Sequence, residues 1–145
     1  MIKDIFTVDG NGRPFRQPSS HYLELFDAAQ PKLYEAEAEF TLDLDEDELI
    51  LSLPLVGRVI RPDALDAARS IMSQLAELDA AACAFLFALP GWPYGNDAYL
   101  WLLMVEDDNV RFCYHQHSVN DEQVVGFRRE ENRWHMIGID RRWRG

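Results

Sequence analysis

Residues 35–55, EAEAEFTLDLDEDELILSLPL, decide the fold because apolar and polar residues alternate along them. From Ala36 to Leu44 every second residue is apolar, and from Leu49 to Leu55 every second residue is leucine. A period of two is typical of a half-buried strand, and residues 45–47 supply turn formers between the two runs. The stretch therefore predicts a β-hairpin with an apolar face and an acidic row. Pro54 suits an edge strand or a strand end.

The segment after the hairpin predicts a pair of helices. RPDALDAARSIMSQLAEL, residues 61–78, begins with Pro62 and has Asp63 in its first turn, as helix N-termini prefer. Apolar residues then recur at helical spacing. Asp79 is the predicted N-cap of a second helix through residues 80–89. Upstream, we expect a strand at residues 2–8, a loop at 11–20 and a short helix ending before Pro31.

The last third predicts a meander of four strands. AYLWLLMVE, residues 98–106, is apolar on both faces, which favours a central strand covered on both sides. Turns near residues 107–109, 118–121 and 130–132 separate the next three strands. Strands, a helical pair and more strands predict an α+β fold: an antiparallel sheet with an N-terminal hairpin, a central helical pair and a C-terminal β-meander. We expect residues 1–145 to form a single domain.

Charge and composition limit the possible partners. The chain has 145 residues, 48% of them hydrophobic, and a net charge of −11. This acidic field repels phosphate backbones, so we expect no nucleic-acid partner, whereas a basic protein would be attracted. The alternative is that the acids only keep the protein soluble. No apolar run approaches the ~20 residues of a membrane helix, and the N-terminus does not resemble a signal peptide. With two cysteines outside any CxxC pair, we expect reduced thiols and a cytoplasmic location.

The stretch RFCYHQHS, residues 111–118, raises the question of a metal or ligand site. At ~3.3 Å per residue, Cys113 and His117 lie too far apart along one strand to share an ion. Four-residue turns would instead pair His117 with Glu122, and bring Cys113, His115 and His135 together over Gly126. Such a face could serve a small-molecule binder or enzyme. The other reading is an ordinary polar sheet face, and we predict no metal, no cofactor and no catalytic residue.

Of the two interpretations of the acidic charge, a sequence resemblance favours the first, in which the charge attracts a basic protein partner. The pattern Val110-x-Phe112-x-Tyr114, Val119-Asn120, Val125-x-Phe127 and Trp134 resembles small acidic immunity proteins of bacterial polymorphic toxin and type VI secretion systems. The likeness covers the second half of the chain. It implies a cytoplasmic toxin inhibitor that binds one cognate toxin or effector and blocks its active or substrate-binding surface, without being an enzyme. The ending VVGFRREENRWHMIGI is also similar to the last strands of cystatin-like cone folds of the nuclear-transport-factor type, which hold small molecules.

The candidate partner-binding residues follow from the charge pattern. Residues 35–48 contain eight acids and no base, and the last eighteen residues contain six arginines. Exposed aromatic residues on the loop at 90–97 could anchor a partner. We therefore expect a basic partner to contact Glu37, Glu39, Asp43, Asp45, Glu46 and Asp47, with Trp92 and Tyr94 as aromatic anchors.

Overall fold

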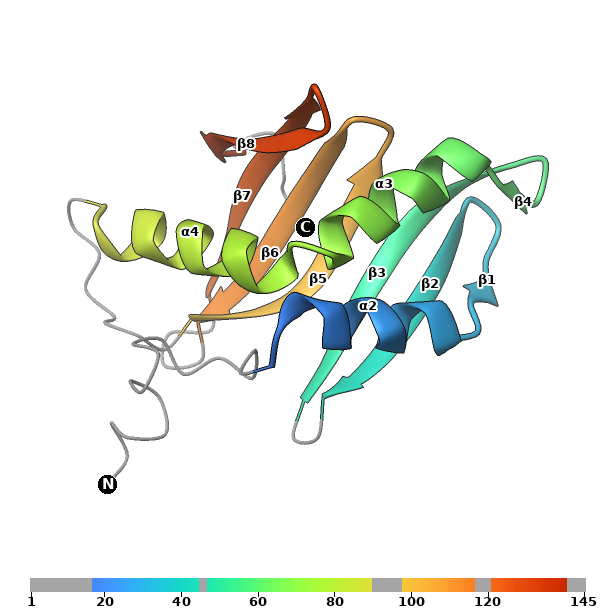
Figure 1. Cartoon of the computed structure of the whole chain (residues 1–145), viewed down its shortest axis with the longest axis horizontal. Coiled ribbons are helices and arrows are strands. Elements are labelled where there is room, and N and C mark those ends of the chain that lie inside the picture. Colours follow the sequence, from blue (N-terminus) through green and yellow to red (C-terminus); the bar gives the residue numbers. More distant parts are fainter. Residues whose placement is uncertain (1–16, 45–46, 90–97, 117–120, 141–145) are drawn as a thin grey trace.

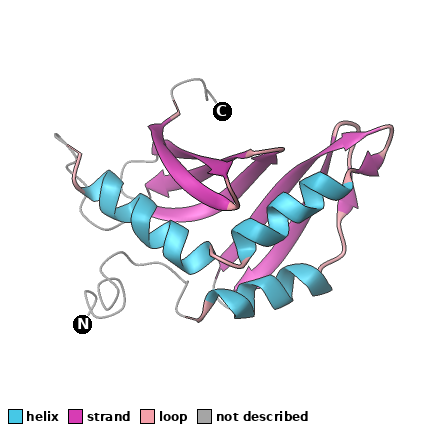
Figure 2. Ribbon diagram, turned by 45° about the horizontal axis from the view of Figure 1, so that its top comes forward, coloured by secondary structure: helices cyan, strands magenta, loops and turns pink. Residues whose placement is uncertain are grey.

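A computed structural model describes residues 17–44, 47–89, 98–116 and 121–140. The described residues form one sheet with three helices on a single face (Figures 1 and 2). The predicted strand at residues 2–8 lies outside the described residues. The predicted short helix is confirmed as α2 (Ser19–Ala28). The remaining elements, in chain order, are β1 (Lys32–Leu33), β2 (Glu37–Leu44), β3 (Asp47–Val56), β4 (Val59–Ile60), α3 (Pro62–Met72), α4 (Leu75–Phe87), β5 (Ala98–Glu106), β6 (Asn109–Gln116), β7 (Asp121–Glu130) and β8 (Arg133–Ile139).

The α+β fold is confirmed, and its sheet joins the predicted hairpin to the predicted meander. The strand order is β1-β2-β3-β5-β6-β7-β8, with β4 paired to β3 off this path. All neighbours are antiparallel except β3 and β5, which run parallel through residues 50–52 and 102–104. A parallel pair needs a long crossover, and the segment between these strands contains β4, α3 and α4. The sequence predicted the helical pair but not the parallel junction that it creates.

The alternation in the hairpin separates a buried face from an exposed one. Phe40 on β2 is 5% exposed, and its ring lies 4.7 Å from that of Phe26 on α2. The same face of the sheet is continued into the core by residues of four more strands: Leu51 and Leu53 on β3, Leu103 and Val105 on β5, Phe112 and Tyr114 on β6, and Val125 and Phe127 on β7. Each fully buried apolar side chain of this kind contributes about 1.5–3 kcal/mol.

The helix pair differs from the prediction at Asp79. Pro62 is at the N-terminus of α3 as predicted, but α4 begins at Leu75, so Asp79 lies inside the helix and is not its N-cap. Its side chain is 0% exposed. The hydroxyl of Tyr114 donates a 2.6 Å hydrogen bond to Oδ1 of Asp79, and the thiol of Cys83 lies 3.7 Å from the same oxygen. This carboxyl group is therefore held by contacts with the sheet and its own helix, whereas an N-cap would hold backbone N–H groups.

The prediction that β5 is covered on both sides is wrong for the described part of the chain. The strand is central, but α2, α3 and α4 lie on one face, and no described helix or strand packs on the other (Figures 1 and 2). We call this second side the open face. On β5 it carries Tyr99, Trp101, Leu102 and Met104, all half-buried. Trp101 is therefore only half-buried, whereas Trp134 on β8 is 7% exposed.

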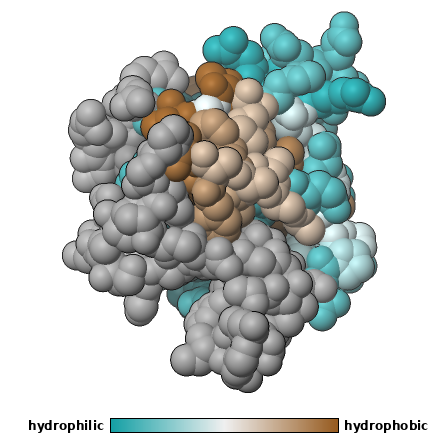
Figure 3. Space-filling model, turned by 90° about the vertical axis from the view of Figure 1, so that its left-hand side faces the viewer, coloured by the Kyte–Doolittle hydropathy of each residue, from teal (hydrophilic) through white to brown (hydrophobic). Residues whose placement is uncertain are grey.

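After Asp79, helix α4 is apolar on its exposed side as well as on its buried side. Cys83 and Leu86 point into the core, whereas Ala80, Ala81 and Ala84 are exposed, and Figure 3 shows apolar surface at the α4 end of the molecule. Among the described residues no single helix has both the length and the apolarity to cross a membrane. Of the described helices, only α3 and α4 taken together reach that length and apolarity, and the chain bends by 71° between them.

Candidate functional site

The acidic row lies along the hairpin at the edge of the open face. We define it as Glu35, Glu37, Glu39, Asp43 and Glu48. Asp43 and Glu48 are exposed and directly opposite each other on β2 and β3, a like-charge pair, while Glu37 and Glu39 are half-buried. Asp47 is exposed at the first position of β3. Of the other predicted contact residues, Asp45, Glu46, Trp92 and Tyr94 lie outside the described residues.

The row is not neutralised by the arginines that the structure describes. Arg111 pairs with Glu106 and Asp140, at 2.7 Å each, and Arg129 pairs with Asp66 and Asp108. Lys32 is the cross-strand neighbour of Glu39, but its ammonium lies over the Tyr34 ring, 5.5 Å from the centroid. Within the described chain, no residue of the acidic row makes an ion pair within 4.0 Å. Among the described residues, these negative charges therefore have no cationic partner, and water and salt screen them.

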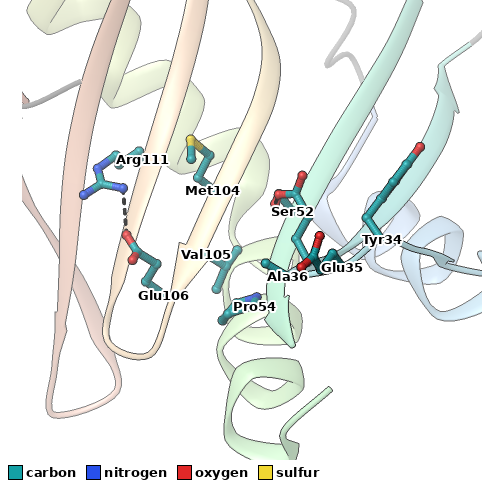
Figure 4. A pocket seen from close by; sticks show the side chains of 10 residues that line it. Tyr34, Glu35, Ala36, Ser52, Pro54, Met104, Val105, Glu106 and Arg111 are labelled. Carbon is teal, nitrogen blue, oxygen red and sulfur yellow. Dashed lines mark hydrogen bonds and ion pairs between the residues drawn. The ribbon is translucent and has the colours of Figure 1, made fainter. Parts of the chain in front are cut away.

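Beside the row, the end of the β3–β5 pairing leaves a hollow in the open face. Strand β3 pairs with β5 only as far as Ser52, and it pairs with β4 from Leu55 onward. Pro54 sits between these two pairings, where its missing N–H leaves no donor unsatisfied. The two strands diverge from this point, and Figure 4 shows Pro54 and Val105 on opposite sides of the gap. We call this hollow, of about 410 Å³, the fork hollow.

The fork hollow has an apolar lining and charged sides. Ala36, Pro54, Met104 and Val105 supply apolar surface, while Glu35 lies on one side and Glu106 and Arg111 on the other (Figure 4). Glu37, which is opposite Pro54 on β2, also lines the hollow. Glu37 accepts a hydrogen bond from the hydroxyl of Ser52 across the strand pair. On the far side, hydrogen bonding to Asp140 raises the pKa of Arg111 above its usual value, against a smaller lowering by burial.

A β-bulge places Trp101 on the open face. The pairing of β5 with β6 shifts between Leu100 and Leu102, so one extra residue is accommodated and a side chain is redirected. Trp101 and Tyr99 line a second shallow hollow of about 380 Å³, together with Asp47, Glu48, Ile50, His115 and Glu122. Burial raises the pKa of Tyr99, and the charges of Asp47 and Glu122 raise it further. The indole N–H of Trp101 is buried and has no hydrogen-bond acceptor.

The predicted convergence of Cys113, His115 and His135 is wrong. The observed register is displaced by two residues, so Cys113 pairs with Val124, His115 with Glu122 and Arg111 with Gly126. His135 lies opposite Arg128, four residues along β7 from Val124, which separates it from Cys113 by ~13 Å along the strand. Within the described ranges, no group of three His, Cys, Asp or Glu side chains could hold a metal ion.

Cys113 is also poorly suited to chemistry. Its thiol is buried, and burial raises its pKa to about 12, helped by the negative charges of Glu122 and Asp140 and opposed by Arg111. The reactive species of a cysteine is the thiolate. Near neutral pH this sulfur is therefore protonated and inert.

Several residues of the open face were missed by the sequence reasoning. Trp101, Met104, Arg111 and Glu48 were not among the predicted contact residues. The bulge at residues 100–102 has no sequence signature here, because a run of apolar residues does not reveal which side each one faces. The hairpin acids were found because their alternation is unambiguous.

The chain was compared with protein-family models, curated proteins and solved structures, and none of them matches it. The resemblance to immunity proteins therefore stays a prediction. The described residues define an α+β domain in which no described helix or strand covers the open face of the sheet, and the carboxylates that border this face make no ion pair with a described residue.

Proposed function

We propose that this protein is a bacterial immunity protein of the toxin-inhibitor type, which acts in the cytoplasm by binding a cognate toxin or effector with a basic surface. The observation that carries the proposal is the acidic row. Its carboxylates border the open face of the sheet, and none forms an ion pair within the described chain. A ridge of this kind attracts a cationic protein surface over a range set by the Debye length, about 8 Å at physiological salt.

The negative charge of the acidic row suits a toxin partner that itself binds a negatively charged substrate. An enzyme that attacks nucleic acid needs positive charge to hold its phosphate substrate. An acidic protein can occupy that surface and associate rapidly through electrostatic steering. The open face adds half-buried apolar groups such as Trp101 and Met104 next to the row, and tight interfaces combine an apolar centre with a charged rim.

Charge reversal in the row tests this function. The substitutions Glu39→Lys, Asp43→Lys and Glu48→Lys change the net charge by +6 and touch exposed or half-buried sites. The matched control reverses three exposed acids that are not part of the acidic row, Glu24→Lys, Glu130→Lys and Glu131→Lys, with the same total charge change. The partner to be tested is the product of a neighbouring reading frame that encodes a toxin-like protein, and its affinity is measured by calorimetry at 0.15 M salt.

We expect the row variant to weaken binding at least tenfold, through slower association, and to relieve inhibition of the toxin. The control should change affinity less than threefold, because its charges lie outside the contact. Equal losses in both variants would mean that only net charge matters. An unchanged affinity in the row variant, or no complex with any basic partner, would contradict the proposal.

A further inference from the structure

The fork hollow contains a mismatch between its apolar lining and its charged sides. Ala36, Pro54, Met104 and Val105 form apolar surface wide enough to cover a hydrocarbon chain, in a space of about 410 Å³. The carboxylate of Glu35 stands at one side of it (Figure 4), and Glu37 belongs to the same lining. An apolar ligand would leave those charges without partners, and a compact ion would leave the apolar surface in water.

Charge compensation inside the hollow is also one-sided. On the β5–β6 side, Glu106 is paired with Arg111 at 2.7 Å, and Arg111 is held in turn by Asp140. On the β2 side, the described partner of Glu37 is the neutral hydroxyl of Ser52, and Glu35 makes no ion pair with a described residue. Lys32, on the neighbouring strand β1, lies over the Tyr34 ring. The position for a positive charge is therefore next to Glu35 and Glu37.

We infer that the fork hollow receives the side chain of an arginine from the protein partner. Its methylene stem packs on Ala36, Pro54 and Met104, and its guanidinium reaches the carboxylates of Glu35 and Glu37. Arginine suits the site because its stem is apolar while its planar head offers five N–H donors, enough to serve two carboxylates at once. The inference rests on the proposed function for the source of the arginine, but the recognition chemistry can be measured without the partner.

The probe is n-butylguanidinium, which reproduces the stem and head of arginine, and its neutral counterpart is n-butylurea. Each is titrated into the ¹⁵N-labelled full-length protein while amide chemical shifts are recorded. We expect saturable shifts with butylguanidinium, in the millimolar range, at residues 36, 52 and 105. Butylurea should give shifts at least fivefold smaller, because it lacks the charge.

Two pairs of neutralising substitutions separate the hollow from the acidic row as a whole. Glu35→Gln with Glu37→Gln removes the two carboxylates at the hollow, and its amide oxygens can still accept the Ser52 hydrogen bond. Asp43→Asn with Glu48→Asn removes two charges from the other end of the row. We expect the first pair to weaken butylguanidinium binding at least fivefold and the second to change it less than twofold. Ala36→Trp, at an exposed position, should fill the hollow and abolish the shifts.

Three results would overturn the inference: unsaturable shifts spread along the whole row, equal shifts with butylurea, or equal weakening by both pairs of substitutions. Each would mean general screening of negative charge. These failures differ from failure of the proposed function. A toxin partner that binds through Glu39, Asp43 and Glu48 but tolerates Glu35→Gln with Glu37→Gln would leave the function standing and remove the arginine site.

Discussion

The hydroxyl of Tyr114 on β6 donates a hydrogen bond of 2.6 Å to Oδ1 of Asp79 on α4, and both side chains are fully buried. This contact joins the middle of the sheet to the second helix of the crossover, 35 residues earlier in the chain. A buried carboxyl group without its donor loses the hydrogen bond and keeps the cost of leaving water. The bond therefore fixes the position of α4 on the sheet.

Replacing Tyr114 with phenylalanine removes only that donor. We expect Tyr114→Phe to lower the free energy of unfolding by about 1–3 kcal/mol, measured from urea denaturation midpoints. The matched control is Tyr34→Phe, since Tyr34 is 41% exposed and its change should stay within about 0.5 kcal/mol. Equal stability of Tyr114→Phe and the parent protein would show that the bond does not hold the helix.

The position of Asp79 inside α4 could not be predicted from the local sequence. Asp79 follows an apolar helix and precedes three alanines, so an N-cap was the reasonable local reading. Its buried hydrogen bond depends on the sheet register, which aligns Tyr114 with α4. The hairpin, by contrast, was predictable because its signal lies within the local sequence. Leu42, Leu44, Leu49 and Leu51 alternate strictly, and a one-residue slip would turn all of them to solvent.

One part of the candidate site, the acids of the hairpin, could be predicted from the sequence. Glu37, Glu39 and Asp43 could be placed on one face of β2 because alternation alone fixes their side. The fork hollow could not be predicted, because it exists where β3 changes its partner from β5 to β4, and the parallel pairing joins residues about 50 positions apart. The predicted register of β6 on β7 was also wrong by two residues. The assumed turn paired His117 with Glu122, whereas Glu122 pairs with His115.

The pair of acids at Asp43 and Glu48 predicts a stabilising substitution. The two residues are directly opposite on neighbouring strands and both are exposed, and like charges in this position repel. We expect Glu48→Lys to raise the free energy of unfolding by a few tenths of a kcal/mol in low salt, because repulsion becomes attraction. The gain should fall by more than half at 1 M NaCl. Thermal unfolding at the two salt concentrations checks both statements, and a loss of stability in low salt would contradict them.

The turn between β7 and β8 contains a strained residue. Glu131 and Asn132 have φ of 54° and 64°, the two left-handed positions of a type I′ turn. Asparagine tolerates this conformation, whereas a longer side chain such as glutamate disfavours it. We expect Glu131→Asn to stabilise the protein by about 0.5–1 kcal/mol and the β-branched Glu131→Val to destabilise it by a similar amount. Urea denaturation measures both, and changes of the same sign would refute the argument.

The raised pKa of Cys113 predicts a loss of stability at alkaline pH. In the folded protein burial raises the thiol pKa from about 9 to about 12, with Glu122 and Asp140 adding to the shift. Between these values the unfolded chain loses the thiol proton while the folded protein keeps it. The unfolded state then binds fewer protons, so the free energy of unfolding falls as pH rises, with a slope approaching 1.4 kcal/mol per pH unit. Below pH 8 both states hold the proton, and the thiol contributes no pH dependence.

The measurement compares the parent protein with Cys113→Ala by urea denaturation between pH 7 and 11. Alanine leaves a small cavity and lowers stability at every pH, but it removes the thiol, so its curve should lack the Cys113 part of the alkaline slope. Tyrosines, lysines and Cys83 titrate in both proteins and cancel in the difference. The gap between the two curves should therefore narrow steadily above pH 9. A gap that stays constant to pH 11 would mean that the thiol ionises as readily in the folded protein as in the unfolded chain, and that the open face around Cys113 admits water.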